Sequence, residues 1–175
     1  SFVNSVKLHS ERDYNLKIIT ENNKKLIIKI SNPSEKYNIL LLQDSMLDYL
    51  SKSKVKDFIP VPLHTKINKY KDNMDRECYV RILSFIEGDI FVDKQSNKTL
   101  CKNFAKFLGN LSKSLLNFDH PAAHRKFVWN SADIDWVENY KELFFEKSKK
   151  NIIEMVMESY SQNVKSKLSN IRYSV

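Results

Sequence analysis

Residues 24–33, KKLIIKISNP, decide the predicted fold. Their centre, 26–30, is short, β-branched and apolar except for Lys29, which predicts a buried strand that contains one charge. A buried ammonium is costly unless a carboxylate or a phosphate pairs with it. The phosphates of a bound nucleotide are the partner that we favour. Taken alone, the stretch fits better with an edge strand that carries Lys29 on its solvent face.

Composition places the chain among ordinary globular proteins. Its 175 residues, 42% of them hydrophobic, suffice for one domain or two small lobes. No run approaches the ~20 apolar residues of a membrane span, and 1–5 resemble no signal peptide. We therefore expect a soluble, cytoplasmic protein. Cys78 and Cys101 form no CxxC pair, so we expect two reduced and packed thiols without a metal.

The net charge of +8 comes mostly from lysines that are spread along the chain among acidic residues. This pattern favours an anionic ligand or simple solubility over nucleic acid, whose readers concentrate Arg and Lys in one patch with aromatic residues. Gly88 and Gly109 are the only glycines. The chain therefore has no glycine-rich phosphate loop, and any phosphate-binding turn must use other residues.

The first half of the chain predicts an antiparallel meander. Phe2–Leu8 and Tyr14–Thr20 alternate as strands do and precede the lysine strand. The turn Ser10–Asn15 could cover phosphates through its backbone amides and the side chains of Ser10 and Asn15, although an ordinary hairpin turn fits it better.

A helix is predicted next, from Glu35 to about 52–54, with Ser34 as its N-cap. Asp44 lies on this helix, where its carboxylate either reaches the lysine strand or is simply solvated. An extended connector at 58–62 leads to a hairpin formed by 64–70 and 77–85. Helices are predicted after that, at 99–117 and 163–173, and between them 133–148 and 149–160 form one broken helix or two adjacent helices. The plan is α+β, with an N-terminal lobe at 1–88 and a helical second lobe at 89–175.

This order of elements resembles the smaller lobe of a protein kinase-like fold and the start of its larger lobe. Four stretches carry the likeness: Ser10–Asn15, Leu26–Asn32, Val80–Gly88 and Leu116–Arg125. The last of these, followed by Phe-Val-Trp at 127–129, is the most distinctive. Together they resemble the aminoglycoside phosphotransferase and choline kinase superfamily, in its hydroxylysine kinase-like branch.

The resemblance implies a site for ATP or GTP with Mg²⁺. By this likeness Lys29 holds the α- and β-phosphates, and the turn from Ser10 to Asn15 lies over the nucleotide. A hinge would bind the base through its backbone; its residues are Leu83, Ser84, Phe85, Ile86 and Glu87. Asp44 stands where the family usually has a glutamate that orients the lysine, and its side chain is one methylene shorter. The implied partner is a small-molecule hydroxyl acceptor such as an amino-alcohol, a hydroxy-amino acid or an aminoglycoside.

One departure concerns catalysis. The family's catalytic Asp and metal ligands follow a His-x-Asp strand, and the chain contains no such motif. Together with the absence of Met at Ser1, this indicates the N-terminal part of a longer enzyme, which we expect to be inactive alone and to self-associate through exposed apolar helix faces. The alternatives are a non-catalytic docking module and, with less support, a basic nucleic-acid-binding domain. His120 and His124 flank Pro121, and we expect a turn whose imidazoles cap helices rather than a metal or catalytic role.

Overall fold

The computed structural model describes residues 1–171. The chain divides into two compact units, one comprising Ser1–Ala123 and another that begins at His124. The lobe boundary predicted near Gly88 thus falls inside the first unit. The division into lobes at 1–88 and 89–175 stays a prediction.

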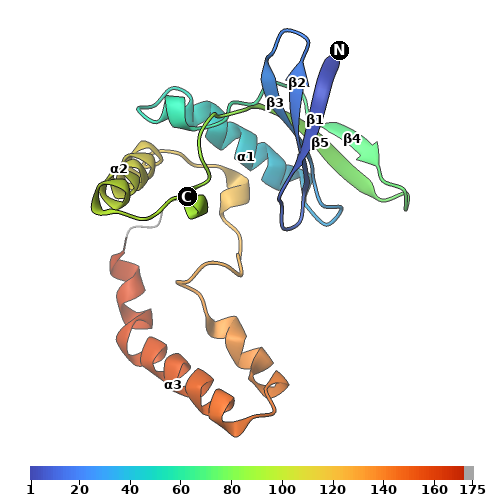
Figure 1. Ribbon diagram of the computed structural model, residues 1–175. Coiled ribbons are helices and arrows are strands. Elements are labelled where there is room, and N and C mark those ends of the chain that lie inside the picture. The colour runs from blue at the N-terminus through green and yellow to red at the C-terminus, as the bar shows by residue number, and fades with distance from the viewer. Residues whose placement is uncertain (172–175) are drawn as a thin grey trace. The chain divides into compact units, whose positions relative to one another are not determined.

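The first unit contains a five-stranded antiparallel sheet of order β1-β2-β3-β5-β4 (Figure 1). Its strands are β1 (Phe2–Leu8), β2 (Tyr14–Thr20), β3 (Lys25–Ile30), β4 (Asn68–Lys71) and β5 (Glu77–Ser84). The predicted α+β plan, with this sheet followed by helices, is confirmed. Because β3 lies in the middle of the sheet, the alternative of an edge strand for the lysine stretch is wrong.

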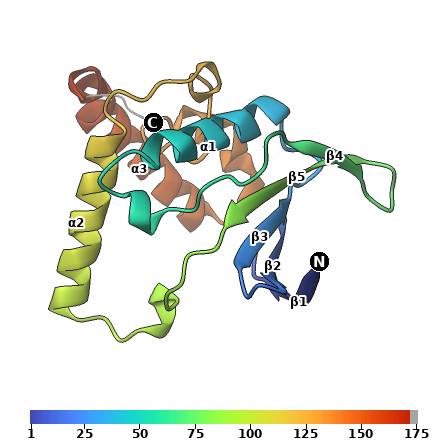
Figure 2. The ribbon, with the colours of Figure 1, turned by 90° about the horizontal axis from the view of Figure 1, so that it is seen from above.

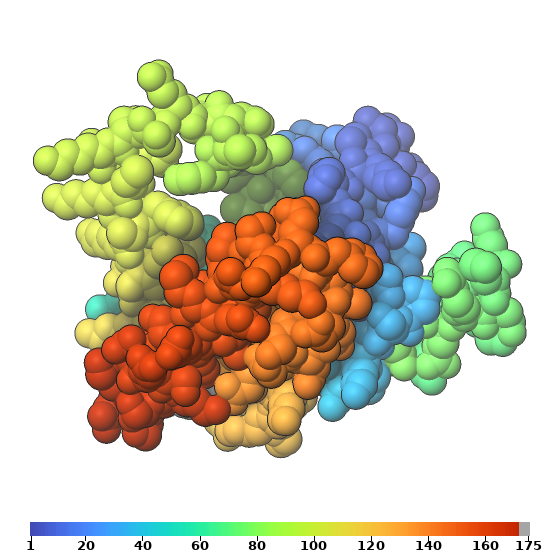
Figure 3. Space-filling view, turned by 90° about the horizontal axis from the view of Figure 1, so that it is seen from below, coloured from blue at the N-terminus to red at the C-terminus, as the bar shows by residue number. Residues whose placement is uncertain are grey.

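Two hairpin turns of this sheet adopt a left-handed backbone without glycine. Asn23, between β2 and β3, has a φ of 55°, and Asp75, between β4 and β5, has a φ of 60°. Asn and Asp tolerate this region better than other residues with a Cβ, because their short polar side chains can hydrogen-bond locally. The β4–β5 hairpin, green in Figure 3, projects beyond the blue strands at the start of the chain.

Helix α1 (Tyr37–Leu50) packs beside the sheet and buries an apolar face that includes Ile39, Leu40 and Leu42. The prediction of Ser34 as its N-cap is wrong, since Lys36 occupies that position and no side chain caps the helix. The side chain of Asn32 explains the difference. Its Oδ1 accepts hydrogen bonds from the Ser34 N–H at 3.0 Å and the Ser34 hydroxyl at 2.8 Å, so Ser34 belongs to a turn before the helix.

Helix α2 (Lys98–Ser114) begins at the N-cap Asn97, whose Oδ1 accepts a hydrogen bond from the Leu100 N–H at 2.9 Å. The end of α1 and the segment that follows it lie beside α2 (Figure 2). A buried apolar cluster joins these elements: Leu50, Val55, Ile59 and Leu115. Three short 3-10 turns complete the unit: η1 (Lys56–Phe58), η2 (Phe91–Asp93) and η3 (Pro121–Ala123).

The second unit holds α3 (Lys147–Asn163) between two 3-10 segments, η4 (Asp135–Leu143) and η5 (Lys165–Asn170). The prediction of one broken helix or two adjacent helices over 133–160 is confirmed, since Phe144 adopts an extended backbone between η4 and α3. The observed bounds differ from the predicted ones, and the first helix is of the 3-10 type. The last predicted helix is reduced to η5, and residues 172 and 173 of that prediction lie outside the described residues. The Tyr160 hydroxyl donates a hydrogen bond of 2.9 Å to the Ala132 carbonyl and ties α3 to the preceding loop.

Large apolar side chains are exposed in this second unit, among them Trp129 at 79% and Phe145 at 98%. Self-association through such surfaces stays a prediction. Within residues 1–171, we find no helix with the length and apolar content that crossing a bilayer requires.

Candidate functional site

Three polar residues line up across the middle of the sheet. Asn15 of β2 is directly opposite Lys29 of β3, and Lys29 is directly opposite Arg81 of β5. Residues opposite one another in an antiparallel sheet project from the same face. Arg81 contacts α1 through Asp44, so this is the face that α1 covers. We call Asn15, Lys29 and Arg81 the polar row.

Lys29, with 26% of its side chain exposed, pairs with a carboxylate that the sequence prediction did not select. Its Nζ lies 3.7 Å from Oδ2 of Asp13, the residue just before β2. The other oxygen of Asp13 accepts a hydrogen bond of 3.1 Å from the Asn32 N–H. The hairpin register could have found this pair, because it brings the start of β2 beside the end of β3.

Arg81 is 3% exposed and is held by two side chains of α1. Its guanidinium donates hydrogen bonds to Asp44 Oδ1 at 2.9 Å and to Gln43 Oε1 at 2.6 Å. Asp44 Oδ2 lies 2.7 Å from Nε2 of His64, and His64 Nδ1 lies 3.1 Å from the carbonyl oxygen and 3.2 Å from the amide nitrogen of Ile82. Because a carboxylate oxygen is an acceptor, Nε2 donates the hydrogen bond to Asp44. Asp44 therefore pairs with Arg81 and His64, and its predicted action on Lys29 stays a prediction.

Asn15 has an unsatisfied amide oxygen. Its Oδ1 is buried and, within the described part of the chain, accepts no hydrogen bond. A buried acceptor left unpaired costs about 1–3 kcal/mol. An N–H or O–H donor that reached this oxygen would remove the penalty, and Lys29 occupies the neighbouring register position.

The β1–β2 turn, which contains Ser10, is fastened to the loop between β3 and α1. The Arg12 guanidinium donates to Ser34 Oγ at 2.8 Å, and the Asn32 side chain donates to the Arg12 carbonyl at 3.4 Å. The bond from the Asn32 N–H to Asp13 makes a third link. The turn predicted to cover phosphates is thus anchored to a second segment, and Ser10 itself is half-buried.

The predicted hinge begins inside β5. Leu83 is buried, and the Ser84 N–H donates to the Val61 carbonyl at 2.9 Å while the Ser84 hydroxyl accepts the Val61 N–H at 2.8 Å. Along the described chain, the backbone of 85–87 forms no hydrogen bond to other backbone groups or side chains. Backbone groups that could bind a base are therefore those of 85–87 rather than that of Ser84.

The side chains of this hinge are occupied. The Glu87 carboxylate pairs with Lys25 at the start of β3, and this hydrogen bond lowers the pKa of Glu87. Lys17 of β2 places its Nζ 4.2 Å from the centroid of the Phe85 ring, a cation–π contact.

Residues 1–171 contain no group of three or more His, Cys, Asp or Glu that could hold a metal ion. Both cysteines are free thiols; Cys78 is buried as predicted, whereas the prediction of a packed Cys101 is wrong, because it lies on an exposed part of α2. The prediction that the His120 imidazole caps a helix is confirmed for the short 3-10 helix η3, since its Nδ1 accepts the Ala122 N–H at 3.1 Å.

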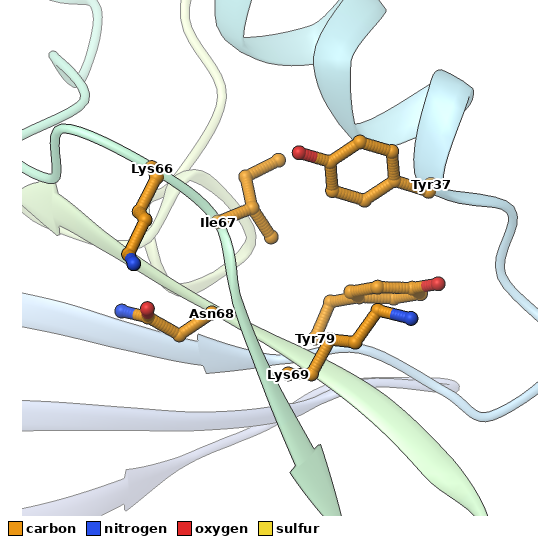
Figure 4. A pocket seen from close by; sticks show the side chains of 6 residues that line it. All are labelled: Tyr37, Lys66, Ile67, Asn68, Lys69 and Tyr79. Carbon is orange, nitrogen blue, oxygen red and sulfur yellow. The ribbon is translucent and has the colours of Figure 1, made fainter.

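A surface pocket near the end of the polar row has no predicted site residue in its lining (Figure 4). Tyr37 and Tyr79 face it, with ring centroids 5.3 Å apart, and Ile67 lies between them and the start of β4. Lys66, Asn68 and Lys69 complete the lining. We assign this pocket no role.

Comparisons with known proteins give relatives by sequence and by fold. No family model matches the chain. Hydroxylysine kinase of Mus musculus is 26% identical over 97 residues, which cover 53% of this chain and 26% of that protein. The solved structure of amicoumacin kinase in complex with AMP-PNP, Ca²⁺ and Ami superimposes with a TM-score of 0.63 at 14% identity, covering 97% of this chain and 49% of that one.

A putative fructosamine-3-kinase from Thermobifida fusca YX-ER1 superimposes with a TM-score of 0.48 at 11% identity, over 99% of this chain and 59% of that one. That score is too low to support an argument.

The fold is therefore that of a protein kinase-like protein, in which a small antiparallel sheet precedes helices. The resemblance to the aminoglycoside phosphotransferase and choline kinase superfamily, in its hydroxylysine kinase-like branch, is confirmed. The chain spans about a quarter of hydroxylysine kinase and about half of amicoumacin kinase.

Proposed function

We propose that this chain supplies the nucleotide-binding part of a small-molecule kinase. The reaction would transfer the γ-phosphate of ATP or GTP to a hydroxyl of an amino-alcohol, a hydroxy-amino acid or an aminoglycoside-like acceptor. The observation that carries the proposal is the polar row, which places Lys29 on the central strand of a kinase-like sheet. The similarity to hydroxylysine kinase favours a small hydroxylated amine as the acceptor. A cytoplasmic location belongs to the same proposal.

Charge on the polar row supports a phosphate ligand. Lys29 and Arg81 are cations directly opposite each other, an arrangement that is unfavourable unless anions neutralise it. Asp44 lies within hydrogen-bond distance of Arg81, whereas Asp13 stands 3.7 Å from Lys29, beyond the range of a good hydrogen bond. The Lys29 ammonium thus keeps donor capacity for the α- and β-phosphates.

The remaining predicted residues take roles around this ammonium. Asn15 lies beside Lys29 with an unsatisfied amide, and the anchored turn that includes Ser10 would cover the phosphates. Asp44 would act indirectly, by fixing Arg81 next to Lys29 and holding α1 against the sheet.

The hinge would bind the base through the backbone of 85–87, with Leu83 and Ser84 fixing its direction. Glu87 is paired with Lys25, so its backbone rather than its carboxylate is the group that we assign to the nucleotide.

Mg²⁺, bound with the nucleotide, would neutralise the phosphates, and the catalytic base would be an aspartate of the larger lobe. The 175 residues contain no His-x-Asp sequence. We therefore propose that this chain alone binds nucleotide and does not turn it over.

Isothermal titration with AMP-PNP and Mg²⁺ tests the proposal. Lys29→Met should weaken binding about 10–100-fold, because a hydrogen bond to a charged group contributes about 1.5–3 kcal/mol. Lys24→Met is the matched control, since Lys24 is exposed, lies one residue before the same strand and forms no ion pair among the described residues. Equal affinities of the wild type and Lys29→Met for AMP-PNP would show that Lys29 does not bind the phosphates.

A non-catalytic docking module is the second candidate. The pair between Lys29 and Asp13 favours it, because the carboxylate offsets the buried charge without any ligand. A docking module predicts no nucleotide binding in the same titration, even when the chain is extended to the full length of its relatives.

A further inference from the structure

A hollow on the first unit is lined almost wholly by lysine and serine. Its lining comes from the segment that follows α1 and from the last turns of α2. These two segments are neighbours in the ribbon of Figure 2. We call this concavity the lysine hollow, and its lining residues are Ser51, Lys52, Ser53, Lys54, Lys56, Asn110, Lys113 and Ser114. None of them belongs to the polar row or the hinge.

In the part of the chain that the structure describes, the four ammonium groups of the lysine hollow have no acidic partner. Some lysines elsewhere do form ion pairs, for example Lys25 with Glu87 and Lys94 with Asp89. Within residues 1–171, Lys52, Lys54, Lys56 and Lys113 form none, and no Asp or Glu lines the hollow. Like charges that gather in one concavity repel each other and raise the local concentration of anions.

Helix ends give these lysines an alternative role. Helices α1 and α2 both end at the hollow, and cations are favoured near the carbonyl end of a helix. However, backbone amides already bond carbonyls of these ends. The Ser51 N–H donates to Leu47 at 2.9 Å, the Ser53 N–H to Leu50 at 2.9 Å, and the Leu115 N–H to Leu111 at 3.1 Å. The ammonium groups are therefore not needed as caps.

The base of the hollow is fixed before any ligand arrives. Ser53 Oγ donates to the Leu50 carbonyl at 2.7 Å and accepts the Val55 N–H at 3.2 Å, which closes a tight turn after α1. Leu50 and Val55 then anchor this turn in the buried cluster with Leu115 of the α2 end. Only the lysine side chains need to be ordered on binding, so the entropic cost is confined to them.

From this arrangement we infer that the lysine hollow binds a small anion with clustered phosphoryl groups, at a site separate from the proposed nucleotide site. Lysine is a flexible point charge that suits phosphates of varied geometry. Nucleic acid is disfavoured, because no aromatic ring and no Arg lines the hollow to stack on bases. The ligand is therefore recognised by charge density, as in an oligophosphate or a polyphosphorylated headgroup.

Isothermal titration with tripolyphosphate, in Mg²⁺-free buffer at 50 mM salt, tests this inference. All variants carry Lys29→Met, so that the polar row does not contribute to the signal. The hollow variant replaces Lys52, Lys54, Lys56 and Lys113 with Gln. The control replaces four exposed lysines outside the hollow with Gln, so that both variants have the same net charge. These lysines form no ion pair among the described residues: Lys24, Lys36, Lys98 and Lys147. Circular dichroism checks that both remain folded.

We expect the hollow variant to bind tripolyphosphate at least tenfold more weakly than its parent, and the control to stay within threefold. Equal losses in the two variants would overturn the inference, because they would show an effect of net charge alone. Absence of binding in the Lys29→Met parent would overturn it too.

A second arm identifies the source of the phosphates. Phosphatidylcholine vesicles with 5% phosphatidylinositol bisphosphate are sedimented with each variant. If the parent binds the vesicles more tightly than tripolyphosphate and the hollow variant does not, the ligand is a lipid headgroup. If the parent binds the vesicles more weakly than tripolyphosphate, the ligand is a free oligophosphate. A single-stranded oligonucleotide is titrated as well. Equal affinity for the hollow variant and its parent would show that nucleic acid does not bind in the lysine hollow. Affinity that is higher than for tripolyphosphate and is lost in the hollow variant would overturn the inference that the ligand is a small phosphorylated anion.

Discussion

The ion pair between α1 and β5 gives the sharpest test of how this sheet is held together. Asp44→Ala removes the carboxylate that accepts hydrogen bonds from Arg81 at 2.9 Å and His64 at 2.7 Å. Arg81 is 3% exposed, so its charge would stay buried, with Gln43 as its remaining partner. We expect this substitution to weaken the packing of α1 on the sheet.

The structure sets the size of the effect. Removing one partner of a buried ion pair costs about 3–5 kcal/mol, and the lost hydrogen bond of His64 adds about 1 kcal/mol. The retained bond to Gln43 offsets part of this, which gives a net loss of about 4 kcal/mol in the free energy of unfolding. Asp89→Ala is the control, because the side chains of Asp89 and Lys94 are 74% and 50% exposed. Such a pair contributes about 0–1 kcal/mol.

Hydrogen exchange followed by mass spectrometry is the appropriate assay. Trp129 and Trp136 both lie in the second unit, so tryptophan fluorescence would not report on the sheet. Peptides from β3 and β5 report their opening free energies directly. In a double-mutant cycle, Arg81→Met with Asp44→Ala should cost at least about 1 kcal/mol less than the sum of the single changes. A loss below about 1 kcal/mol for Asp44→Ala would refute the account of this pair.

Two further predictions concern thiol reactivity and pH. Cys78 is 4% exposed and burial raises the pKa of its thiol, so iodoacetamide at pH 8 should modify Cys101 first; mass spectrometry that finds equal rates would contradict this. The hydrogen bond from Lys25 lowers the pKa of Glu87 below 4.5, so its contribution to stability is present above that value and is lost as the pH falls through the lowered pKa. A ¹³C NMR titration should show this lowered pKa, and Lys25→Met should return it towards 4.5.

Local patterns carried the fold prediction. Alternating apolar residues and the polar clusters between them placed β1 and β2 at their observed bounds, because hairpins depend on neighbours in sequence. For the second unit, the sequence predicted one broken helix or two adjacent helices over 133–160, and the structure has two helices with a break after Leu143. Their bounds and the 3-10 type of η4 were not predicted, because η4 buries no residue and a helical pattern without burial does not fix the type of helix.

The candidate site was only half predictable. A lone charge in an apolar strand singled out Lys29, since an unpaired ammonium needs a partner wherever the strand lies. Its partner Asp13 and the pair of Asp44 with Arg81 depend on strand register and helix placement across 16 and 37 residues of sequence. Arg81 is part of a stretch that was recognised for its order in the fold, and nothing in that stretch indicated that its guanidinium would compete with Lys29 for Asp44.

The hydrogen bonds that hold the β1–β2 turn to the β3–α1 loop have a consequence for nucleotide release. The β1–β2 turn is hydrogen-bonded through Arg12, Asp13 and Asn32 to the loop that leads into α1, and so it cannot move independently of that loop. If nucleotide binds beneath the turn, as proposed, the turn and the loop would have to move together before the product could leave. In the proposed full-length kinase, release of the nucleotide, rather than phosphoryl transfer, would then limit the rate.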